Sequence, residues 1–379
     1  MNVAAEQVLA FRLAGQDLAT PAADASAALR GWTVQDSPPG TAVAAVLART
    51  EDGAIDAGWL DRALFEDRTL VALYNARTAT AVLPAGEAAT YATAMLPGDD
   101  DAGLKAIAGP ALPDISEGFA EPVALGVAAI SDALDGATLS RDDLHEALRQ
   151  RLPGALLPWC KGCETHHARR GLLVLAGLHG RLCLAGRVGR QPAFARTDQW
   201  TGWDAPDRAT AGIELVRRYL TAYGPSTHQH FQQWSGLGTA HAKALWTSAA
   251  GEVSEVAVGG APAWALTRDL PRLQDPPPAP GVRLLAPGDP LLVGRDREAL
   301  VPDPALRKQL FAVLAGPGLV LVDGRPAALW RARKQGKRLT VAVAPLGPAA
   351  DRPDPRALQA AAERLAPHRG VSSVTVETS

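Results

Sequence analysis

The sequence has few cysteines, little net charge and no long apolar run. Its 379 residues include three cysteines, an odd number without the spacing of a disulfide framework, which fits a reducing compartment. No uninterrupted apolar stretch is long enough to cross a bilayer, and the start, MNVAAEQVLAFRLAG, lacks the basic and apolar regions of a secretory signal. These absences argue against a secreted disulfide-rich protein and a membrane protein, so we expect a cytoplasmic location. The formal net charge of −2 is not typical of a nucleic-acid-binding protein. Nucleic-acid binding depends on local basic patches, however, so the net charge does not exclude it.

What the chain does contain is typical of a soluble globular protein. Hydrophobic residues make up 47% and charged residues 21% of the sequence, a balance that argues against wholesale disorder. The length exceeds that of one ordinary core and predicts two to three domains. The basic residues are mostly arginine, whose planar guanidinium suits bidentate contacts with phosphate.

A pattern of three helices followed by a hairpin is clearest between Arg208 and Leu270. Apolar residues recur at helical spacing before Gly224-Pro225 ends the first helix. A second helix is predicted through Trp234 and a third from Thr239 to about Ala249, followed by two strands that flank a glycine turn at 259–260. This order is typical of a winged helix, whose third helix enters a DNA groove.

The same order is predicted twice more upstream. In the second pass, helices at 123–134, 141–152 and 165–178 precede a hairpin with the basic tip Arg187-Val188-Gly189-Arg190. The first pass is weaker and carries additions. Its predicted elements are helices at 4–14 and 22–29, an extra strand at 32–35, an extra helix after Pro39, and a hairpin around Asn75-Ala76-Arg77.

The run QDPPPAP at 274–280 predicts a stiff linker to a β-rich C-terminal domain. Beyond it, VRLLAP, LLVG, GLVLVDG, PAALWRA, LTVAVAPL and SSVTVE are strand-like, with a helix at about 355–365. We therefore predict an α+β fold of three tandem winged-helix units and a barrel-like C-terminal domain. The predicted boundaries are 1–118, 119–206, 207–273 and 281–379.

The segment LPWCKGCETHHARRG is open to three interpretations. A zinc site of three cysteines and one histidine would use Cys160, Cys163, Cys183 and either His166 or His167. No second C-x-x-C is present, however, and Cys183 falls in an alternating strand where it is expected to face the core. The second interpretation is therefore that Cys160 and Cys183 are small buried apolar residues. As a third interpretation, His166, His167 and Arg169 open the DNA-facing helix of the second unit, where helix N-termini attract phosphate. We favour DNA contact and expect neither metal nor cofactor.

Several segments, taken in order, resemble the winged-helix DNA glycosylases of the AlkZ and YcaQ (AlkX) type. They are FRLAGQDL, VQDSPPGTAVAAVLAR, TLVALYNARTATAVLPAGE, LPWCKGCETHHARRGLL, LVRRYLTAYGPSTHQHFQQWSGL, LLAPGDPLLVGRDRE and GLVLVDGRPAALWRARK, and they cover nearly the whole chain. The resemblance implies three tandem winged helices and a β-rich domain around a concave DNA-binding surface. It also implies hydrolysis of the N-glycosidic bond of alkylated purines, including bulky adducts and interstrand crosslinks. The family includes self-resistance enzymes of antibiotic producers.

The resemblance further points to a catalytic Gln-x-Gln or Gln-x-Asp motif. Matching VQDSPPGTA to the family segment puts Gln35 at the second position, while Thr33 replaces the first glutamine. A neutral amide can orient a water against the oxocarbenium-like sugar, because a cationic purine departs without a general acid. The Thr33 hydroxyl would hold the same water or a phosphate. Asp36 is expected to cap the helix that follows Pro38-Pro39, and on residues alone a polar strand edge explains Thr33 and Gln35 equally well.

The predicted function is that of a monomeric, monofunctional DNA glycosylase acting on double-stranded DNA with N7-guanine or N3-adenine adducts, in self-resistance to a DNA-alkylating natural product. Each further basic candidate alone fits a solvated charge, but together they could neutralise several phosphates. These DNA-contact candidates are Arg77, Arg187, Arg190, Arg217, Lys243 and Arg333. Two alternatives remain: a non-catalytic winged-helix DNA-binding regulator and a zinc-stabilised interaction module.

Overall fold

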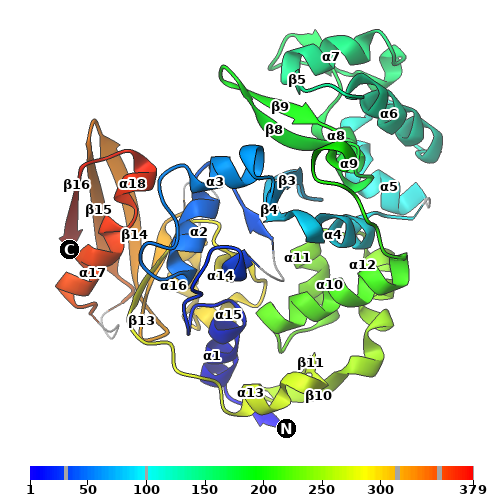
Figure 1. The fold of residues 1–379 in the computed structure, drawn as a ribbon. Helices are drawn as coiled ribbons and strands as arrows, with labels where there is room; N and C mark the ends of the chain where they lie inside the picture. Colours follow the sequence, from blue (N-terminus) through cyan, green and yellow to red (C-terminus); the bar gives the residue numbers. More distant parts are fainter. Residues whose placement is uncertain (30–32, 99–100, 312–315, 348–351, 379) are drawn as a thin grey trace. The chain divides into compact units, whose positions relative to one another are not determined.

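The computed structural model describes residues 1–29, 33–98, 101–311, 316–347 and 352–378, which fold into two compact units (Figure 1). Unit 1 comprises residues 1–59, 217–230 and 252–379, and unit 2 comprises residues 60–216 and 231–251. Both units contain helices and strands, so the α+β class is confirmed. The number of winged-helix units and the four predicted domain boundaries stay predictions.

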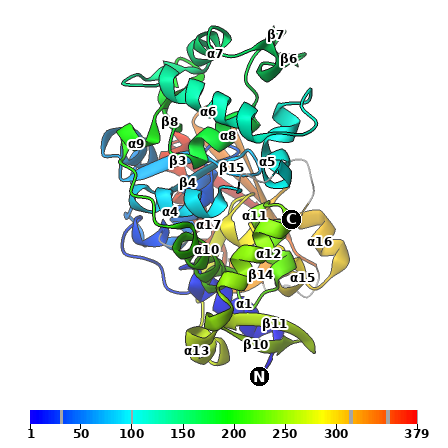
Figure 2. The ribbon, with the colours of Figure 1, turned by 90° about the vertical axis from the view of Figure 1, so that its right-hand side faces the viewer.

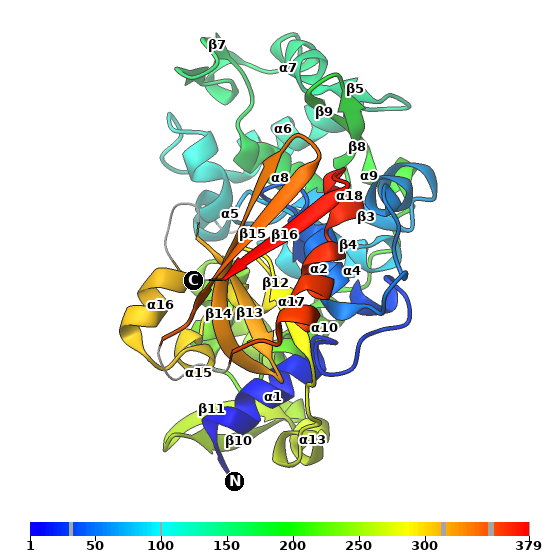
Figure 3. The same ribbon diagram turned by 90° about the vertical axis from the view of Figure 1, so that its left-hand side faces the viewer.

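Unit 1 contains an open five-stranded sheet in its C-terminal part (Figure 3). The sheet order is β12 (Val282–Leu285), β13 (Gly318–Val322), β14 (Arg325–Gln335), β15 (Arg338–Pro345) and β16 (Ser373–Thr378). The first four strands are antiparallel, whereas β16 runs parallel to β15. Parallel neighbours need a crossover, and α17 (Pro355–Glu363) with α18 (Ala366–Arg369) supplies it. Within the described part of the chain β12 and β16 do not pair with each other, so the predicted barrel-like closure is wrong.

The N-terminal segment of unit 1 packs on a hairpin from the middle of the chain (Figure 2). Strand β1 pairs in parallel with β10, and Val3, Val8, Phe11, Val256 and Leu273 form one buried cluster. These elements are β1 (Asn2–Val3), α1 (Ala5–Gly15), β10 (Val253–Val258), β11 (Ala261–Leu266) and α13 (Leu270–Gln274). The remaining regular elements of this unit are β2 (Val34–Gln35), α2 (Thr41–Arg49), α14 (Pro290–Val293), α15 (Arg297–Leu300) and α16 (Pro304–Leu310).

A fully buried ion pair joins two helix ends inside unit 1. The terminal nitrogens Nη1 and Nη2 of Arg49, at the end of α2, donate to the two carboxylate oxygens of Asp289, each at 2.8 Å. Both side chains have zero solvent exposure. Asp289 also accepts from the backbone N–H of Leu291 at the start of α14, and Arg49 Nη2 donates to Gln16 Oε1 at 3.2 Å. Both terminal nitrogens of Arg49 and both carboxylate oxygens of Asp289 therefore have hydrogen-bond partners in the low-dielectric interior.

The core of unit 2 consists of antiparallel strands and the buried helix α8. Its antiparallel strands follow the order β4 (Thr80–Pro84), β3 (Leu70–Tyr74), β8 (Cys183–Val188), β9 (Gln191–Ala195) and β5 (Leu139–Ser140). Its longer helices are α4 (Ala88–Met95), α5 (Asp101–Ala108), α6 (Ala120–Ala133), α7 (Arg141–Arg149), α8 (Arg170–Leu178) and α12 (Thr239–Ser248). Smaller elements are α9 (Thr197–Trp200) and the two-stranded hairpin of β6 (Trp159–Cys160) and β7 (Thr165–His166).

Most predicted elements are present at the expected positions. The pattern between Arg208 and Leu270 is confirmed as α10 (Arg208–Tyr223), α11 (His228–Ser235), α12, β10 and β11. The upstream hairpins are confirmed as β3–β4 and β8–β9, and Ser140 caps α7 by accepting from the backbone N–H of Asp143. Residues 275–280 of the predicted linker belong to no helix or strand, whereas its first residue, Gln274, ends α13. Trp32, at the start of the extra strand, lies outside the described residues.

Three element predictions are wrong for local reasons. Residues 22–29 form only the short 3₁₀ turn 27–29, because the backbone of Ala22 is bonded to Arg49 and Glu51 in an extended bridge. The strand-like LLVG lies largely in α14, since Asp289 caps this helix and Pro290 opens it. The predicted helix 165–178 begins only at Arg170, because Thr165 and His166 pair with Cys160 and Trp159.

Candidate nucleic-acid interface

Unit 2 contains a cavity of about 1270 Å³ on the side where α7, the β6–β7 hairpin and the start of α8 meet. The hairpin lies beside α7 (Figure 2), and Arg149 of α7 donates to the backbone carbonyl of His166 in β7 at 3.2 Å. The opposite wall is the turn after β3, with Ala76, Arg77 and Thr78. Residues as far apart in the sequence as Tyr74 and Phe194 therefore share one cavity.

The lining of this cavity is strongly basic. Six cationic side chains line it and one carboxylate, that of Asp142, opposes them. The cationic residues are Arg77, Arg141, Arg149, Lys161, Arg169 and Arg170. Such an imbalance concentrates polyanions in a concave site, and arginine offers the fork geometry that phosphate accepts.

Arg169 and Arg170 are held by backbone carbonyls. Arg169 donates from Nη2 to the carbonyl of Trp159 at 2.8 Å, and Arg170 donates from Nη1 to the carbonyl of Thr78 at 3.2 Å. The guanidinium of Arg170 also lies 5.2 Å from the ring centroid of Tyr74. Within the described part of the chain, no carboxylate forms an ion pair with either residue. A carbonyl orients a guanidinium but does not neutralise it, so both charges stay available for an anion.

One face of α7 adds three groups that the sequence analysis did not single out. Arg141, His145 and Arg149 follow each other at intervals of four residues, which places them on one side of a helix. All three line the cavity. Their four-residue spacing is visible in the sequence and indicates that they share one helix face. It indicates a binding site only when a cavity is known to lie on that face.

The two adjacent histidines point in different directions. His166 is exposed on β7, where its Nδ1 lies 2.8 Å from the carbonyl of Leu157 and its ring meets Trp159 edge-on. His167 is half-buried, lines the cavity and lies with its ring centroid 4.5 Å from that of His145. Neither histidine belongs to a helix, so their predicted place on the first turn of α8 is wrong.

Helix α8 is not the exposed recognition helix that the pattern suggested. Its residues from Gly171 to Leu178 are all buried, and it packs against α4, α5, α6 and β3. Only its start is accessible, through Arg170 and the preceding residue Arg169. The apolar run GLLVLAGL explains this burial, because a helix that is hydrophobic all round belongs in a core.

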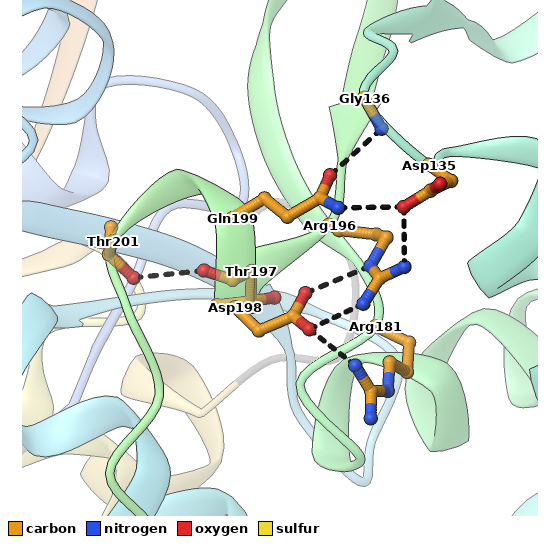
Figure 4. A network of polar contacts seen from close by, with 8 residues as sticks. All are labelled: Asp135, Gly136, Arg181, Arg196, Thr197, Asp198, Gln199 and Thr201. Atoms are coloured by element: carbon orange, nitrogen blue, oxygen red, sulfur yellow. Dashed lines mark hydrogen bonds and ion pairs between the residues drawn. The ribbon is translucent and has the colours of Figure 1, made fainter.

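The β8–β9 hairpin has a fixed base and an exposed tip. At its base, Arg196 forms a bidentate pair with Asp198 at 2.6 and 3.0 Å and also reaches Asp135 at 2.8 Å (Figure 4). Gln199 extends the same network to Asp135 and to the backbone N–H of Gly136. At the tip, Arg187 and Arg190 are exposed, as predicted for a hairpin end, and the apolar Val188 between them is 57% exposed.

The two remaining candidates of unit 2 occupy different positions. Arg77 lies in the turn after β3, where Asn75 Oδ1 accepts from the backbone N–H groups of Arg77 and Ala79, and its side chain lines the cavity. Lys243 is exposed on α12 and does not line the cavity. The cavity therefore gathers three of the predicted contacts of this unit, namely Arg77, His167 and Arg169.

The candidate catalytic residues lie in unit 1. Val34 of β2 is fully buried, whereas Thr33 and Gln35 on either side of it are half-buried, as alternation along an extended strand requires. Gln35 Nε2 donates to the carbonyl of Ser37 at 3.2 Å. Asp36 does bind the start of the next helix, because its Oδ1 accepts from the backbone N–H groups of Gly40 and Ala42. That helix begins at Thr41 with Gly40 as its N-cap, and not at Pro38-Pro39.

Two basic candidates of unit 1 differ in how they are held. Arg217 forms a bidentate ion pair with Glu252, at 2.6 and 2.5 Å, so a phosphate would compete with a carboxylate for it. Arg333 lies on β14 and is exposed. The β14–β15 hairpin around it carries further exposed cations, at Lys334, Lys337 and Arg338.

Three residues in unit 2 could hold a metal ion. The ligand atoms of Cys160, Cys163 and His167 lie within 4.8 Å of one another. Cys183 is apart from this group and completely buried on β8, as predicted, and burial raises the pKa of its thiol to about 12. The expected burial of Cys160 is wrong, because this residue lies at the end of the short β6–β7 hairpin and is only half-buried. A site that uses all three cysteines is therefore not formed within the described residues.

The chain is similar to DNA glycosylases in fold and in sequence. The structure of the DNA glycosylase AlkZ from Streptomyces sahachiroi shares the fold, with a TM-score of 0.75 and 24% identity over 100% of both chains. A model of the AlkZ-like DNA glycosylase family matches residues 28–368, and the chain belongs to this family. An interstrand DNA cross-link repair glycosylase from the same organism is 28% identical over 268 residues, which cover 65% of this chain and 66% of that relative. Among the described residues, no helix has the length and apolarity to span a bilayer.

Proposed function

We propose that the protein is a monofunctional DNA glycosylase that removes cationic or bulky N-alkylated purines from double-stranded DNA, including purines held in interstrand crosslinks. Family membership over residues 28–368 carries this proposal. The relative named for interstrand cross-link repair supports crosslinked DNA as a substrate class. Within it we propose N7-guanine and N3-adenine adducts, a monomeric cytoplasmic enzyme, and a role in self-resistance to a DNA-alkylating natural product.

The basic cavity of unit 2 supports a backbone contact with DNA. Arg169 and Arg170 are oriented by carbonyls and form no ion pair within the described residues, so their binding to a phosphate is not offset by the loss of an internal ion pair. Arg141 and Arg149 of the same lining are paired with Asp142 and Glu146. The exposed tip of β8–β9 offers two arginines beside an apolar Val188. Side chains of this kind contact the minor groove and insert between base steps, which suits an enzyme whose bulky lesion does not fit a tight base-flipping pocket.

Gln35 is proposed to position the hydrolytic water. Its Nε2 is engaged with the carbonyl of Ser37, which fixes the plane of the amide and leaves Oε1 as an acceptor for water. An alkylated purine with a positive charge leaves without protonation, so the enzyme needs an oriented nucleophile and stabilisation of the oxocarbenium-like sugar. Thr33, also half-buried, is proposed to hold the same water or an adjacent phosphate. Asp36 is unsuited to act as the base, because it is engaged in capping α2.

Excision of N7-alkylguanine from a synthetic duplex tests the proposal. The purified protein should release the adduct and leave alkali-labile abasic sites. Gln35→Ala should slow single-turnover excision by about 100-fold, the cost of losing orientation of one reactant. Gln359→Ala is the matched control, because this half-buried glutamine of the same unit bonds, among the described residues, to Glu363 and the carbonyl of Val374. Unchanged excision by a folded Gln35→Ala protein would refute the site.

Thr33 stands where the family motif has glutamine. This departure favours one alternative function, that of a DNA-binding regulator without catalysis. The same duplexes separate the two functions. Excision of any adduct establishes the glycosylase. Sequence-selective binding without abasic product, over several N7-guanine and N3-adenine adducts, would replace it with the regulator.

A further inference from the structure

Two cysteines and a histidine converge at one edge of the cavity of unit 2. Cys160 ends β6, Cys163 lies in the turn that follows, and His167 comes directly after β7. Their ligand atoms lie within 4.8 Å of one another, and all three residues line the cavity. Tetrahedral ligands bound to one zinc ion lie roughly 3–4 Å apart, since the Zn–S and Zn–N bonds measure about 2.3 and 2.0 Å. A small closure of side chains therefore suffices to bring the three atoms onto a single ion.

The turn between the cysteines holds their two sulfur atoms close together. The backbone N–H of Cys163 donates to the carbonyl of Cys160 at 3.2 Å, which closes the C-K-G-C turn. Both sulfur atoms lie within 4.8 Å of each other and of a ligand nitrogen of His167. A C-x-x-C turn is the usual spacing of paired cysteine ligands to zinc.

His167 presents a nitrogen in the state that a metal requires. Its Nδ1 lies 2.8 Å from the carbonyl of Ala168, which can only accept, so the proton belongs on Nδ1 and the lone pair on Nε2. Within the described residues Nε2 is shielded from solvent and has no hydrogen-bond partner. A buried nitrogen lone pair without a partner is costly, and a bound cation would satisfy it.

The surroundings favour metal binding over other uses of this cluster. The three cysteines are free, so Cys160 and Cys163 are not consumed by a disulfide. Two thiolates would cancel the charge of a divalent ion, so the complex would not be repelled by the nearby arginines. A donor set of two sulfurs and one imidazole nitrogen is soft and matches zinc.

We propose that Cys160, Cys163 and His167 bind one Zn²⁺ ion, whose fourth position is open to the basic cavity and available to water or a phosphate oxygen. This departs from the expectation that the chain binds no metal. The ion would join the β6–β7 hairpin to the residues that lead into α8, and it would thereby fix Arg169 and Arg170. The proposal does not depend on glycosylase activity, because its tests measure metal.

Metal analysis of the purified protein is the first test, with matched variants. Protein expressed with zinc in the medium should contain one zinc per chain after gel filtration. Cys160→Ser, Cys163→Ser and His167→Gln should each lower that content at least tenfold. Cys183→Ala and His166→Gln are the controls, one removing the buried third cysteine and the other the adjacent exposed histidine, and both should keep the metal. Wild-type protein without stoichiometric zinc, or equal loss in variants and controls, would overturn the site.

Cobalt substitution of the wild-type chain provides a test that does not require the variants to fold. Titration of the chelator-treated protein with Co²⁺ should produce intense visible bands of a tetrahedral ion and thiolate-to-cobalt absorption in the near ultraviolet, saturating at one equivalent. Zinc should displace both signals. Weak bands without thiolate absorption, from protein kept fully reduced under argon, would contradict the proposal.

Discussion

In unit 1, Arg49 is completely buried and pairs with both oxygens of Asp289 at 2.8 Å, whereas in unit 2 Arg169 and Arg170 border a cavity and donate only to backbone carbonyls. The first arrangement compensates the charge where water is absent. The second fixes the direction of the guanidinium without cancelling its charge. Both kinds of arginine are held by hydrogen bonds, yet only the second can gain energy from a phosphate.

The difference matters because the two kinds of arginine fail in different ways. Removing one partner of a buried pair leaves an uncompensated charge, so the fold is damaged. Removing an arginine that binds an external anion leaves the fold intact and weakens the complex. A substitution series that measures both unfolding and DNA binding can therefore assign each arginine to one group.

The largest effect is expected for Asp289→Ala. It strands the buried Arg49 and removes the cap of α14, so the free energy of unfolding should fall by about 3–5 kcal/mol. Urea denaturation measures this. Glu298→Ala is the control, because Glu298 pairs with Arg307 while remaining 76% exposed and should cost at most about 1 kcal/mol. Equal losses of unfolding free energy in the two variants would show that the buried pair is no more important to the fold than the exposed one. An Arg49→Met, Asp289→Leu double variant should recover much of the stability that Asp289→Ala loses.

The range of the interactions explains which parts of this fold the sequence predicts. Elements such as α10 and the β10–β11 hairpin were predicted because apolar spacing, Gly224-Pro225 and Gly259-Gly260 act within a few residues. The Arg49–Asp289 pair joins residues 240 positions apart, and no local pattern reports it. The start of α8 was missed because the pairing of β6 with β7 competes with helix formation at Thr165 and His166.

The candidate sites follow the same rule. Arg77, His167 and Arg169 were predicted from their place in hairpins and helix starts, and the structure brings them to one cavity. His145 was not singled out, because its environment arises from a tertiary contact with His167. Gln35 is known as a candidate only through a resemblance, since a half-buried glutamine on a short strand has no local signature of catalysis.

The next effect in size is a dependence of stability on pH that originates at His145. This residue is 8% exposed, and burial together with the positive charges of His167 and Arg141 lowers its pKa to about 4, against the opposing charge of Asp142. Between about pH 6.5 and pH 4 the unfolded chain therefore binds a proton that the folded chain does not, so stability falls as the pH falls. The loss is at most about 1.4 kcal/mol per pH unit, or about 3 kcal/mol in total.

Comparing the pH dependence of wild type with that of His145→Gln isolates this contribution from the other groups that titrate. The variant should lose less stability than wild type between pH 7 and pH 4.5 in chemical denaturation experiments. His166→Gln, the exposed neighbour of His167, should follow the wild-type curve. If the free energy of unfolding of wild type and His145→Gln depended on pH in the same way, His145 would not be the cause of the loss of stability in acid.

The smallest effect on the fold, and the most informative one for function, is expected for Arg170→Gln. Because this arginine has no carboxylate partner within the described residues, the free energy of unfolding should change by no more than about 0.5 kcal/mol. If Arg170 binds one DNA phosphate, the slope of log Kd for duplex DNA against log salt should fall by about 0.9. Arg151→Gln is the control, since Arg151 is exposed just beyond the end of α7, donates to the carbonyl of Ala147 and does not line the cavity. Equal salt slopes for the two variants would show that Arg170 does not bind a DNA phosphate. The proposal that the cavity contacts DNA would then be wrong.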